Sequence, residues 1–461
     1  MICKICEMVL SFSTEQFFAE YSKEDLMERR EFLKACLTMG ALGAVSRVSP
    51  AFGGMELPVK NRTSGKARSV IEIWIWGGPS QLEAFDPKPG APYDYNGGRK
   101  DIPTNVDGIR ISEYMPELAK IADKYSIIRS MTHPFRGHES ATYLMQTGRM
   151  PGGGITYPAI GAMLAMLNKG NVQHNLPPYV ALTTNKGRFS ECGFLGDRYS
   201  PFSTGGRPES QVFQVDSYSP AGGASQKEMR RRFGLLDELD SFSRESAWNP
   251  VLEQFGKSGA EAKNILFGKA ADIFNLSLES PEMRKRYGMN RFGQSCLCAR
   301  RLVEAGVPYI TINASGWDTH KKHFESLNRI APEMDRAVAT LISDLHEKGL
   351  LDQTIVWWSG EFGRTPRIDW HAPWQGGRNH HSSCFCAMVA GGGFAGGKVV
   401  GSSDATADFP ASRPVSPADL LGSLYELCGI NPDQPFPSNP IGLKSPILES
   451  KASTRLRELY R

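Results

Sequence analysis

Close pairs of histidines mark the places where this chain could do chemistry. Six of the nine histidines form such pairs, which are His133 and His138, His320 and His323, and His380 and His381. Each pair follows a stretch with the composition of a β-strand, and open α/β sheets hold their ligands at the carboxyl ends of parallel strands. Imidazole and carboxylate groups are ordinary ligands for zinc-like ions. The pattern predicts a metal site, although buried, hydrogen-bonded histidines would give the same pattern.

The strongest part of this signal lies in residues 354–381. Its first five residues, TIVWW, have the length and the β-forming composition of a buried strand. Glu361 follows in a glycine-rich turn, and the loop then returns to His380. We therefore expect a carboxylate and an imidazole together at one edge of the sheet. The alternative is a solvated loop in which Glu361 caps a helix.

A second carboxylate and imidazole stand two residues apart in GWDTH, residues 316–320. In an extended segment, side chains two residues apart point the same way. We expect the segments 316–320 and 354–381 together to hold one or two divalent ions, with zinc favoured. The predicted metal ligands are Asp318, His320, Glu361 and His380.

The composition is that of an ordinary globular protein. The 461 residues are 40% hydrophobic and 22% charged, and 53 basic against 49 acidic residues give a net charge of +4. No basic stripe interleaved with aromatic residues points to nucleic acid. No apolar run reaches the ~18 residues that a membrane span needs. We expect neither a nucleic-acid partner nor a transmembrane segment.

The N-terminal region has the layout of an export signal. RREFLK at residues 29–34 precedes an apolar segment at 35–45, and small residues follow at 49–51. This order predicts a twin-arginine signal peptide within residues 1–55, and hence a periplasmic or extracellular protein that uses the twin-arginine export machinery. An amphipathic helix fits poorly, because glycines interrupt the apolar segment and it has no polar face.

The cysteines that follow the signal number six, which in an exported protein permits disulfides. They are Cys192, Cys296, Cys298, Cys384, Cys386 and Cys428. Six in ~400 residues is too sparse for a disulfide scaffold. Cys296 and Cys298 would not share a face of the helix predicted there. We expect buried free thiols rather than a four-thiolate metal site.

Strand-like and helix-like segments alternate along residues 56–461. Strands are expected at 69–76, 125–129, 179–182, 307–312, 354–358 and 386–390. Residues 330–348 have apolar side chains on one helical face and end at Gly349, as a C-terminal cap should. The alternation predicts an α/β domain with a mostly parallel, doubly wound sheet and a charged helical insertion near 226–286.

Several motifs in combination resemble a known family. They are GGPSQ at 77–81, FDPKP at 85–89, TGR at 147–149, GWDTH at 316–320, GEFGRTP at 360–366 and GRNH at 377–380. With the export signal, they resemble domain-of-unknown-function family 1501, exported relatives of the sulfatases and alkaline phosphatases, along nearly the whole chain. The resemblance implies an alkaline-phosphatase-like three-layer α/β/α sandwich, with metal at the carboxyl ends of the central strands.

The resemblance also implies roles for individual positions. Asp318 and His320 match the Asp-and-His ligand pair of the superfamily. Glu361 stands where sulfatases have the Asp of an Asp-His-Gly motif, with Phe362 in place of the His. His380 matches the last ligand.

The first strand departs from the pattern of the superfamily. It should end in a metal-binding Asp, yet it ends in WGG at 76–78. Glu83 or Asp86 could substitute from the following loop. Because Phe362 cannot bind a metal either, the resemblance implies one ion rather than two and a weaker case for efficient catalysis.

The nucleophile of the sulfatases is missing as well. Sulfatases carry Cys-x-Pro-Ser-Arg before a helix that runs on to Thr-Gly-Arg, and His138 stands where that Cys would be. His138 cannot become an aldehyde, so we expect no sulfatase activity of the oxidised-Cys kind. His138 could bind the metal, act as a general acid or base, or attack phosphorus, with Ser140 as the fallback nucleophile. The alternative is that both residues merely begin a helix.

Two functions from different classes remain open. The first is a metal-dependent hydrolase of sulfate or phosphate esters, in which Arg149 or Arg378 clamps the anion through bidentate donors. Its substrate would be a small anionic ester or a sulfated or phosphorylated glycan. The second is a non-catalytic exported binding or assembly protein that keeps the fold.

Overall fold

The computed structural model describes most of the chain after residue 64. The described residues are 65–167, 172–173, 176–183, 192–210, 213, 231, 234–235, 269–436, 441–449 and 454–461. They all belong to one compact unit, Val59–Arg461. The predicted signal peptide and most of the predicted helical insertion lie outside them. Among the described helices, none combines the length and the apolar composition needed to span a bilayer.

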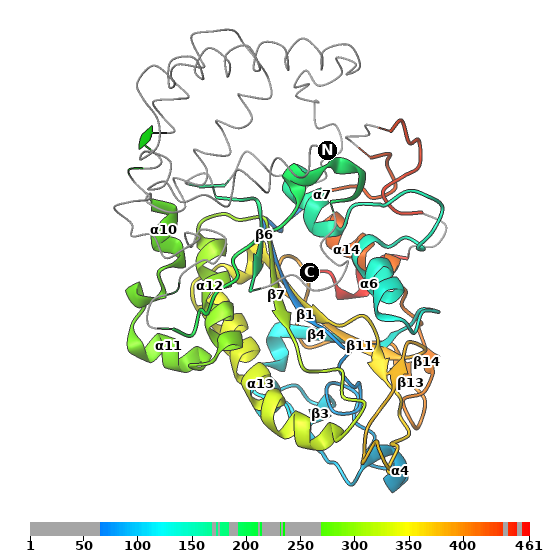
Figure 1. Ribbon diagram of the computed structural model, residues 1–461. Helices are drawn as coiled ribbons and strands as arrows, with labels where there is room; N and C mark the ends of the chain where they lie inside the picture. The colour runs from blue at the N-terminus through cyan, green and yellow to red at the C-terminus, as the bar shows by residue number, and fades with distance from the viewer. Residues whose placement is uncertain are drawn as a thin grey trace, which may run out of the picture. The chain divides into compact units, whose positions relative to one another are not determined.

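An eight-stranded sheet runs through the centre of this unit in the order β12-β4-β11-β8-β1-β7-β5-β6 (Figure 1). The strands are β1 (Ser69–Ile75), β4 (Tyr125–Met131), β5 (Tyr179–Leu182), β6 (Phe202–Ser203), β7 (Tyr309–Ala314), β8 (Thr354–Ser359), β11 (Phe385–Ala390) and β12 (Val399–Val400). β1 pairs in parallel with β7 and β8, whereas β11 is antiparallel to β4 and β8. Residues 360–384 connect β8 to β11 and contain no helix, whereas a connection between parallel strands usually includes one. The antiparallel direction of β11 agrees with this. The predicted mostly parallel α/β sheet is confirmed.

Helices cover both faces of the sheet, with α11, α12 and α13 on one side and α6, α7 and α14 on the other (Figure 1). The described helices are α4 (Tyr93–Asn96), α5 (Pro116–Ala119), α6 (His138–Thr147), α7 (Ile160–Leu167), α10 (Lys269–Phe274), α11 (Pro281–Tyr287), α12 (Arg291–Glu304), α13 (His323–Glu347) and α14 (Pro417–Leu427). Alternate residues of β1 face opposite sides, so Ile71 and Ile73 pack in the α12–α13 core while Val70 and Trp74 pack in the α7–α14 core. Three layers result.

Smaller elements and helix ends differ from the sequence predictions in detail. Three two-stranded ribbons lie outside the main sheet: β2 (Asp101–Pro103) with β3 (Arg110–Ser112), β9 (Gly363–Arg364) with β10 (His380–His381), and β13 (Ser402–Ser403) with β14 (Pro410–Ser412). α13 ends before Gly349 as predicted, but it begins at His323 rather than at 330. Of the predicted insertion, the described residues contain α10 and all but the last residue of α11, and the insertion as a whole stays a prediction.

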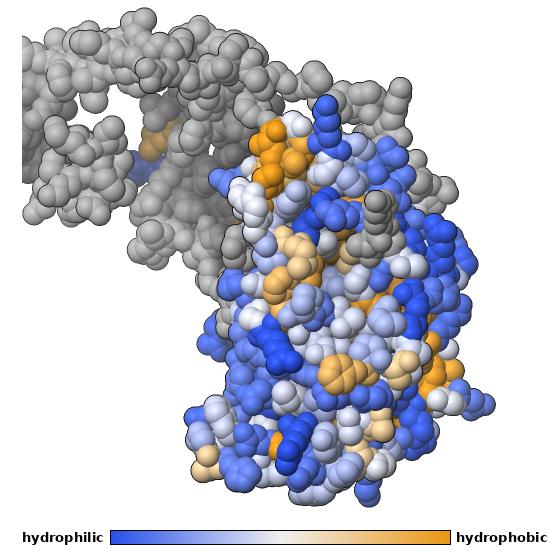
Figure 2. Space-filling view, turned by 90° about the vertical axis from the view of Figure 1, so that its right-hand side faces the viewer, coloured by the Kyte–Doolittle hydropathy of each residue, from blue (hydrophilic) through white to orange (hydrophobic). Residues whose placement is uncertain are grey.

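All six cysteines after residue 64 are free thiols, as predicted. Four of them are buried, while Cys192 and Cys428 are half-buried. The apolar side chains likewise lie mostly inside the molecule. On the face shown in Figure 2, the orange apolar residues form small, separate patches among hydrophilic ones.

Glu72 is a carboxyl group inside this apolar core. It lies on β1, and its two oxygens accept hydrogen bonds from Gln146 of α6 and from the Thr311 hydroxyl of β7, the latter at 2.7 Å. Burial raises the pKa of Glu72 to about 7, against the opposing effect of these hydrogen bonds. Gln146 stands about two turns beyond His138, so this contact fixes α6 against the central strand.

We expect the free energy of unfolding to fall as the pH rises from about 4.5 to about 7, because the folded protein keeps the Glu72 proton that the unfolded chain releases. The contribution of this one carboxyl is on the order of 3 kcal/mol. Glu72→Gln keeps the hydrogen-bonding shape without the ionisation and should flatten this part of the pH dependence. Urea unfolding of both proteins at several pH values measures the difference; parallel profiles would contradict it.

Candidate metal centre

Loops from several elements meet at the carboxyl-terminal edge of the sheet. β7 leads to Asp318 and His320, β8 leads to Glu361, the β9–β10 ribbon carries His380, and α6 begins with His138. The structure thus brings together residues that lie far apart in the sequence. Three of the four predicted ligands lie in one cluster, and His138 joins them.

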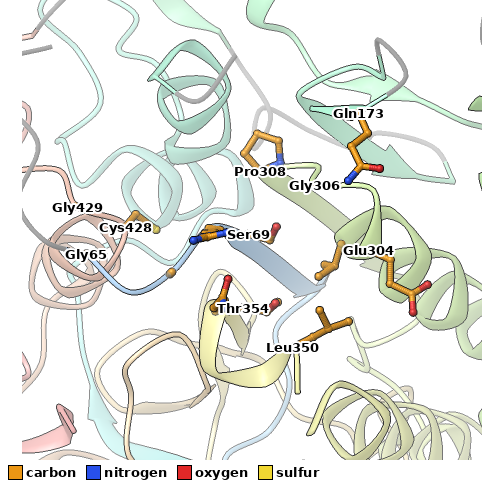
Figure 3. Close-up of a pocket in the computed structure, with 14 residues that line it drawn as sticks. Gly65, Ser69, Gln173, Glu304, Gly306, Pro308, Leu350, Thr354, Cys428 and Gly429 are labelled. Atoms are coloured by element: carbon orange, nitrogen blue, oxygen red, sulfur yellow. The ribbon is translucent and has the colours of Figure 1, made fainter. Parts of the chain in front are cut away.

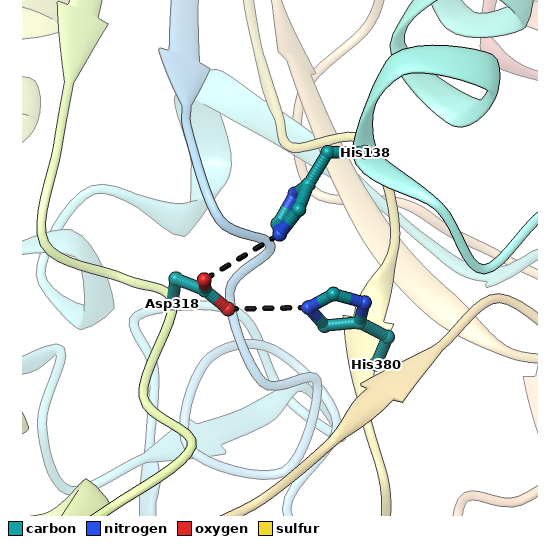
Figure 4. A group of neighbouring side chains, drawn as sticks. All are labelled: His138, Asp318 and His380. Carbon is teal, nitrogen blue, oxygen red and sulfur yellow. Dashed lines mark hydrogen bonds and ion pairs between the residues drawn. The ribbon is translucent and has the colours of Figure 1, made fainter.

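Asp318 is at the centre of this cluster (Figure 4). Its Oδ2 atom lies 3.4 Å from His138 Nε2, and its Oδ1 atom lies 3.2 Å from His380 Nε2 and 3.0 Å from His320 Nε2. The Nε2 atoms of His320 and His380 are only 2.9 Å apart. Ligand atoms of His138, Asp318 and His380 all lie within 4.8 Å of one another. These three side chains could hold a metal ion.

The Nδ1 atom of each of the three histidines forms a hydrogen bond with a different oxygen atom. The acceptors are the side chain of Glu361 for His138 (2.5 Å), the side chain of Asn379 for His320 (2.9 Å) and the main-chain carbonyl of Arg136 for His380 (2.8 Å). A carboxylate or carbonyl oxygen only accepts, so each Nδ1 carries the hydrogen and a neutral ring keeps its Nε2 lone pair. The Nε2 atoms of all three rings face Asp318. Histidines that bind metals are commonly oriented in this way.

Glu361 is buried behind His138 and does not contact Asp318. It is fully buried, and its Oε1 atom accepts from the Gly77 main-chain N–H at 2.9 Å as well as from His138. Its Oε2 atom is buried without a hydrogen-bond partner among the described residues. Glu361 therefore contacts the Nδ1 side of His138, away from Asp318. The contact that the structure shows is with His138, and direct binding of the metal by Glu361 stays a prediction.

The charges in the cluster depend on one another. Hydrogen bonds to Asp318 and Glu361 raise the pKa of His138 to about 9, so without a cation this ring is an imidazolium at neutral pH. Partial burial works against ionisation of Asp318, yet hydrogen bonds from His138, His380 and Arg364 hold its pKa well below the usual range. A divalent ion would take the place of the proton on His138 Nε2.

Arg364 holds Asp318 in place and was not singled out from the sequence. Its guanidinium is fully buried and donates to Asp318 Oδ1, to the Gly78 carbonyl at 3.1 Å and to the Arg378 carbonyl at 3.1 Å. It also donates to the Gly77 carbonyl. The only signal was its place in the turn after β8, and an arginine there more often faces solvent.

Aromatic rings enclose the inner side of the cluster. Trp76 stacks on His138 with ring centroids 5.4 Å apart, and Phe362 stacks on His380 at 4.4 Å. Gly77 adopts φ of +107°, and a Cβ there would lie 2.4 Å from the Asp318 main-chain nitrogen. The close approach of the two loops therefore requires glycine after β1, where the superfamily pattern would have a ligand.

Arg149 and Arg378 do not face the cluster. Arg378 is fully buried and donates to Glu83 Oε1 at 2.7 Å. Arg149 donates to the Ile447 carbonyl and to Glu449 Oε1, both at 3.2 Å. Both guanidinium groups tie loops together inside the protein. This corrects the expectation that they clamp a substrate anion.

Neither candidate nucleophile is set up for attack. Both ring nitrogens of His138 face carboxylates, and the Ser140 hydroxyl, in the first turn of α6, makes no hydrogen bond within the described part of the chain. Ser140 therefore has no base beside it. A side-chain nucleophile of the kind expected from the sequence is not assembled at this site.

The two substitutes considered for the missing Asp of the first strand are also engaged elsewhere. Glu83 pairs with Arg378, and Asp86 pairs with Lys88 at 3.0 Å and lies 3.6 Å from Arg129. Both carboxylates are buried in these ion pairs. Neither belongs to the group of donor atoms around Asp318.

A cavity of about 640 Å³ lies away from the cluster (Figure 3). Its lining includes Ser69 and Thr354, the first residues of β1 and β8, whereas the cluster follows the last residues of these strands. The cavity therefore opens at the opposite end of the sheet and contributes nothing to the candidate centre.

A family model described as a protein of unknown function, DUF1501, matches residues 67–450. The chain belongs to the DUF1501 family. The family suggested by the sequence motifs is thereby confirmed. No curated protein matches the chain.

Among solved structures, the DUF1501 chain is similar to members of the alkaline phosphatase superfamily. One, from Vibrio parahaemolyticus, is 11% identical, with coverage of 94% of this chain and 81% of that one and a TM-score of 0.39. PsFucS1 sulfatase from Pseudoalteromonas sp. is 13% identical, with coverage of 85% and 73% and a TM-score of 0.36. The periplasmic domain of EcEptC from Escherichia coli, in complex with Zn, is 12% identical, with coverage of 85% and 93% and a TM-score of 0.35.

We predict that His320→Ala lowers the affinity of the protein for Zn²⁺ by at least about 10-fold, because it removes one of the converging donors. Calorimetric titration of metal-free protein measures the affinity. His371→Ala is the matched control, since the His371 side chain is 96% exposed and lies outside the cluster. Equal affinities in the His320→Ala variant and the wild type would remove His320 from the site.

Proposed function

We propose that this DUF1501 protein is a metal-dependent hydrolase of phosphate or sulfate esters. The observation that carries the proposal is the convergence of three Nε2 atoms on the carboxylate of Asp318. The cluster is open to solvent, since the side chains of Asp318 and His320 are 41% and 31% exposed. An ester in solution could therefore reach it.

The donor set fits one zinc-like ion. Two ligands that are each about 2.1 Å from zinc, at a tetrahedral angle, lie roughly 3.4 Å apart. The contacts of Asp318 with the three imidazoles, and of His320 with His380, measure 2.9 to 3.4 Å, whereas His320 lies outside the group of His138, Asp318 and His380 whose ligand atoms are all within 4.8 Å of one another. Three imidazoles and one carboxylate are also a common donor set for such ions. The ligands that would hold the ion are His138, His320, His380 and Asp318.

A bound divalent ion supplies Lewis acidity, which polarises an ester oxygen and lowers the pKa of a water molecule. Residues of the protein orient the groups that would bind the ion and shield them from water. Glu361 keeps the hydrogen of His138 on Nδ1, and Arg364 fixes the position of the Asp318 carboxylate. Trp76 and Phe362 cover the inner faces of the imidazoles and exclude water from that side.

Exposed cations beside the cluster favour an anionic substrate. The main-chain carbonyl of Arg136 binds His380, and Lys321 directly follows His320. Both side chains are exposed, and within the described residues neither forms an ion pair. Arg136 and Lys321 can attract the negative charge of an ester, whereas Arg149 and Arg378 form contacts inside the protein. A small anionic ester or a sulfated or phosphorylated glycan fits this environment.

The arrangement favours attack by water over a covalent intermediate on the protein. Ser140, the fallback nucleophile, has no base beside it, and His138 is held by two carboxylates. The oxidised-Cys chemistry of sulfatases is not part of this proposal. We further propose export by the twin-arginine route to the periplasm or the cell exterior, on the strength of residues 29–51.

The lack of an assembled nucleophile also favours the second candidate function, a non-catalytic exported binding protein that uses the metal to hold an anion. The two functions share the site and differ only in turnover. One experiment separates them.

With zinc-loaded protein, we expect hydrolysis of at least one of p-nitrophenyl phosphate, bis-p-nitrophenyl phosphate and p-nitrophenyl sulfate. Asp318→Asn should lower kcat/KM by about 100-fold or more, because it removes the charge around which the site is built. Ser140→Ala is the control and should leave turnover unchanged. Full metal occupancy without turnover of any of the three esters would favour the binding protein instead.

A further inference from the structure

Four buried side chains form a closed ring behind the candidate metal centre. Thr319 Oγ1 lies 2.6 Å from His323 Nδ1, and His323 Nε2 lies 3.1 Å from Glu83 Oε2. Arg378 Nη2 donates to Glu83 Oε1 at 2.7 Å, and its main-chain N–H donates to the Thr319 carbonyl at 3.2 Å. We call Thr319, His323, Glu83 and Arg378 the buried ring.

The positions of the protons in the buried ring can be assigned from the donors and acceptors that its members offer. The Glu83 carboxylate only accepts, so His323 donates to it through Nε2. Burial lowers the pKa of His323, which keeps the ring neutral and leaves Nδ1 to accept from the Thr319 hydroxyl. Burial alone would raise the pKa of Glu83, but Arg378 and His323 bring it to about 2, so the carboxylate stays ionised. These hydrogen bonds hold the four residues in one arrangement, while Arg378 Nε is buried without a hydrogen-bond partner among the described residues.

A hydroxyl, an imidazole and a carboxylate in series are the parts of a nucleophilic triad. The placement of Thr319 argues against that role. Its neighbours Asp318 and His320 are 41% and 31% exposed, whereas Thr319 itself is 4% exposed. The Thr319 hydroxyl thus faces the interior while the two adjacent side chains face solvent. A substrate at the cluster would not reach it.

The buried ring instead connects the two loops that carry most of the metal ligands. Thr319 stands between Asp318 and His320, and Arg378 stands two residues before His380. The loops touch directly as well, because a Cβ on Gly377 would lie 1.8 Å from the His320 carbonyl oxygen. A small shift of either loop would change the 2.9 Å separation between His320 and His380.

We propose that the buried ring is a positioning frame that sets the spacing of the metal ligands on residues 316–320 and 376–380. The proposal rests on the proposed function, since the ion is what the frame prepares for. Groups behind the ligands of a metal site typically change its affinity by about 10- to 100-fold. The frame acts on affinity and leaves the chemical step to the ligands.

Thr319→Val tests the frame, because it keeps the shape of the side chain and removes the hydroxyl. We expect a loss of Zn²⁺ affinity of about 10- to 100-fold and a kcat close to the wild-type value once zinc is saturating. Thr319→Ser should restore the affinity. Thr340→Val is the matched control: Thr340 is a buried residue of α13 whose hydroxyl donates to the Arg286 carbonyl, outside the ring.

A second readout needs no metal. In metal-free protein labelled with ¹⁵N-histidine, the His323 Nε2–H should exchange slowly, and Thr319→Val should shift the resonances of His320 and His380. Unchanged resonances together with unchanged zinc affinity would overturn the frame, and so would lost turnover at unchanged affinity, which would make Thr319 a nucleophile. If the wild type bound no zinc, the proposed function would fail while the histidine resonances would still decide on the frame.

Discussion

The carboxyl-terminal edge of the sheet depends on the contact between Asp318 and Arg364. A partly buried carboxylate that gathers three imidazoles stays ionised because hydrogen bonds from His138, from His380 and from the buried Arg364 guanidinium lower its pKa. Arg364 is held in turn by main-chain carbonyls of the loops after β1 and β9. Removing one partner of such a pair leaves the other charge uncompensated, at a cost of several kcal/mol. The pair therefore fixes three loops at once and defines where a cation can bind.

The sheet and α6 bring the remaining ligand to that point. α6 is attached to the central strand at both ends, through the stack of Trp76 on His138 and through the hydrogen bond between Gln146 and Glu72. The first contact sets the plane of the imidazole, and the second sets the position of the helix. A polar group in the core, which would otherwise destabilise the fold, thus serves to align a residue of the site.

The sequence was sufficient for the features that arise from local patterns. Strand periodicity, the glycine after α13 and the GWDTH and GRNH motifs led to the mostly parallel sheet and to Asp318, His320 and His380. It was insufficient where a role depends on contacts between distant residues. Glu361 meets His138 across 223 positions, and Arg364 meets Gly77 across 287. No local pattern distinguishes a buried arginine from an exposed one, so Arg149 and Arg378 were assigned to the substrate and Arg364 was overlooked.

X-ray absorption at the zinc edge of zinc-loaded protein measures whether three histidines and Asp318 surround one ion. We expect three imidazole nitrogens and one carboxylate oxygen at about 2.0 to 2.2 Å from the zinc, and no sulfur. His138→Gln should remove one imidazole from that shell and leave the other ligands in place. Sulfur in the coordination shell, or the same spectrum in the wild type and in the His138→Gln variant, would rule out this set of ligands.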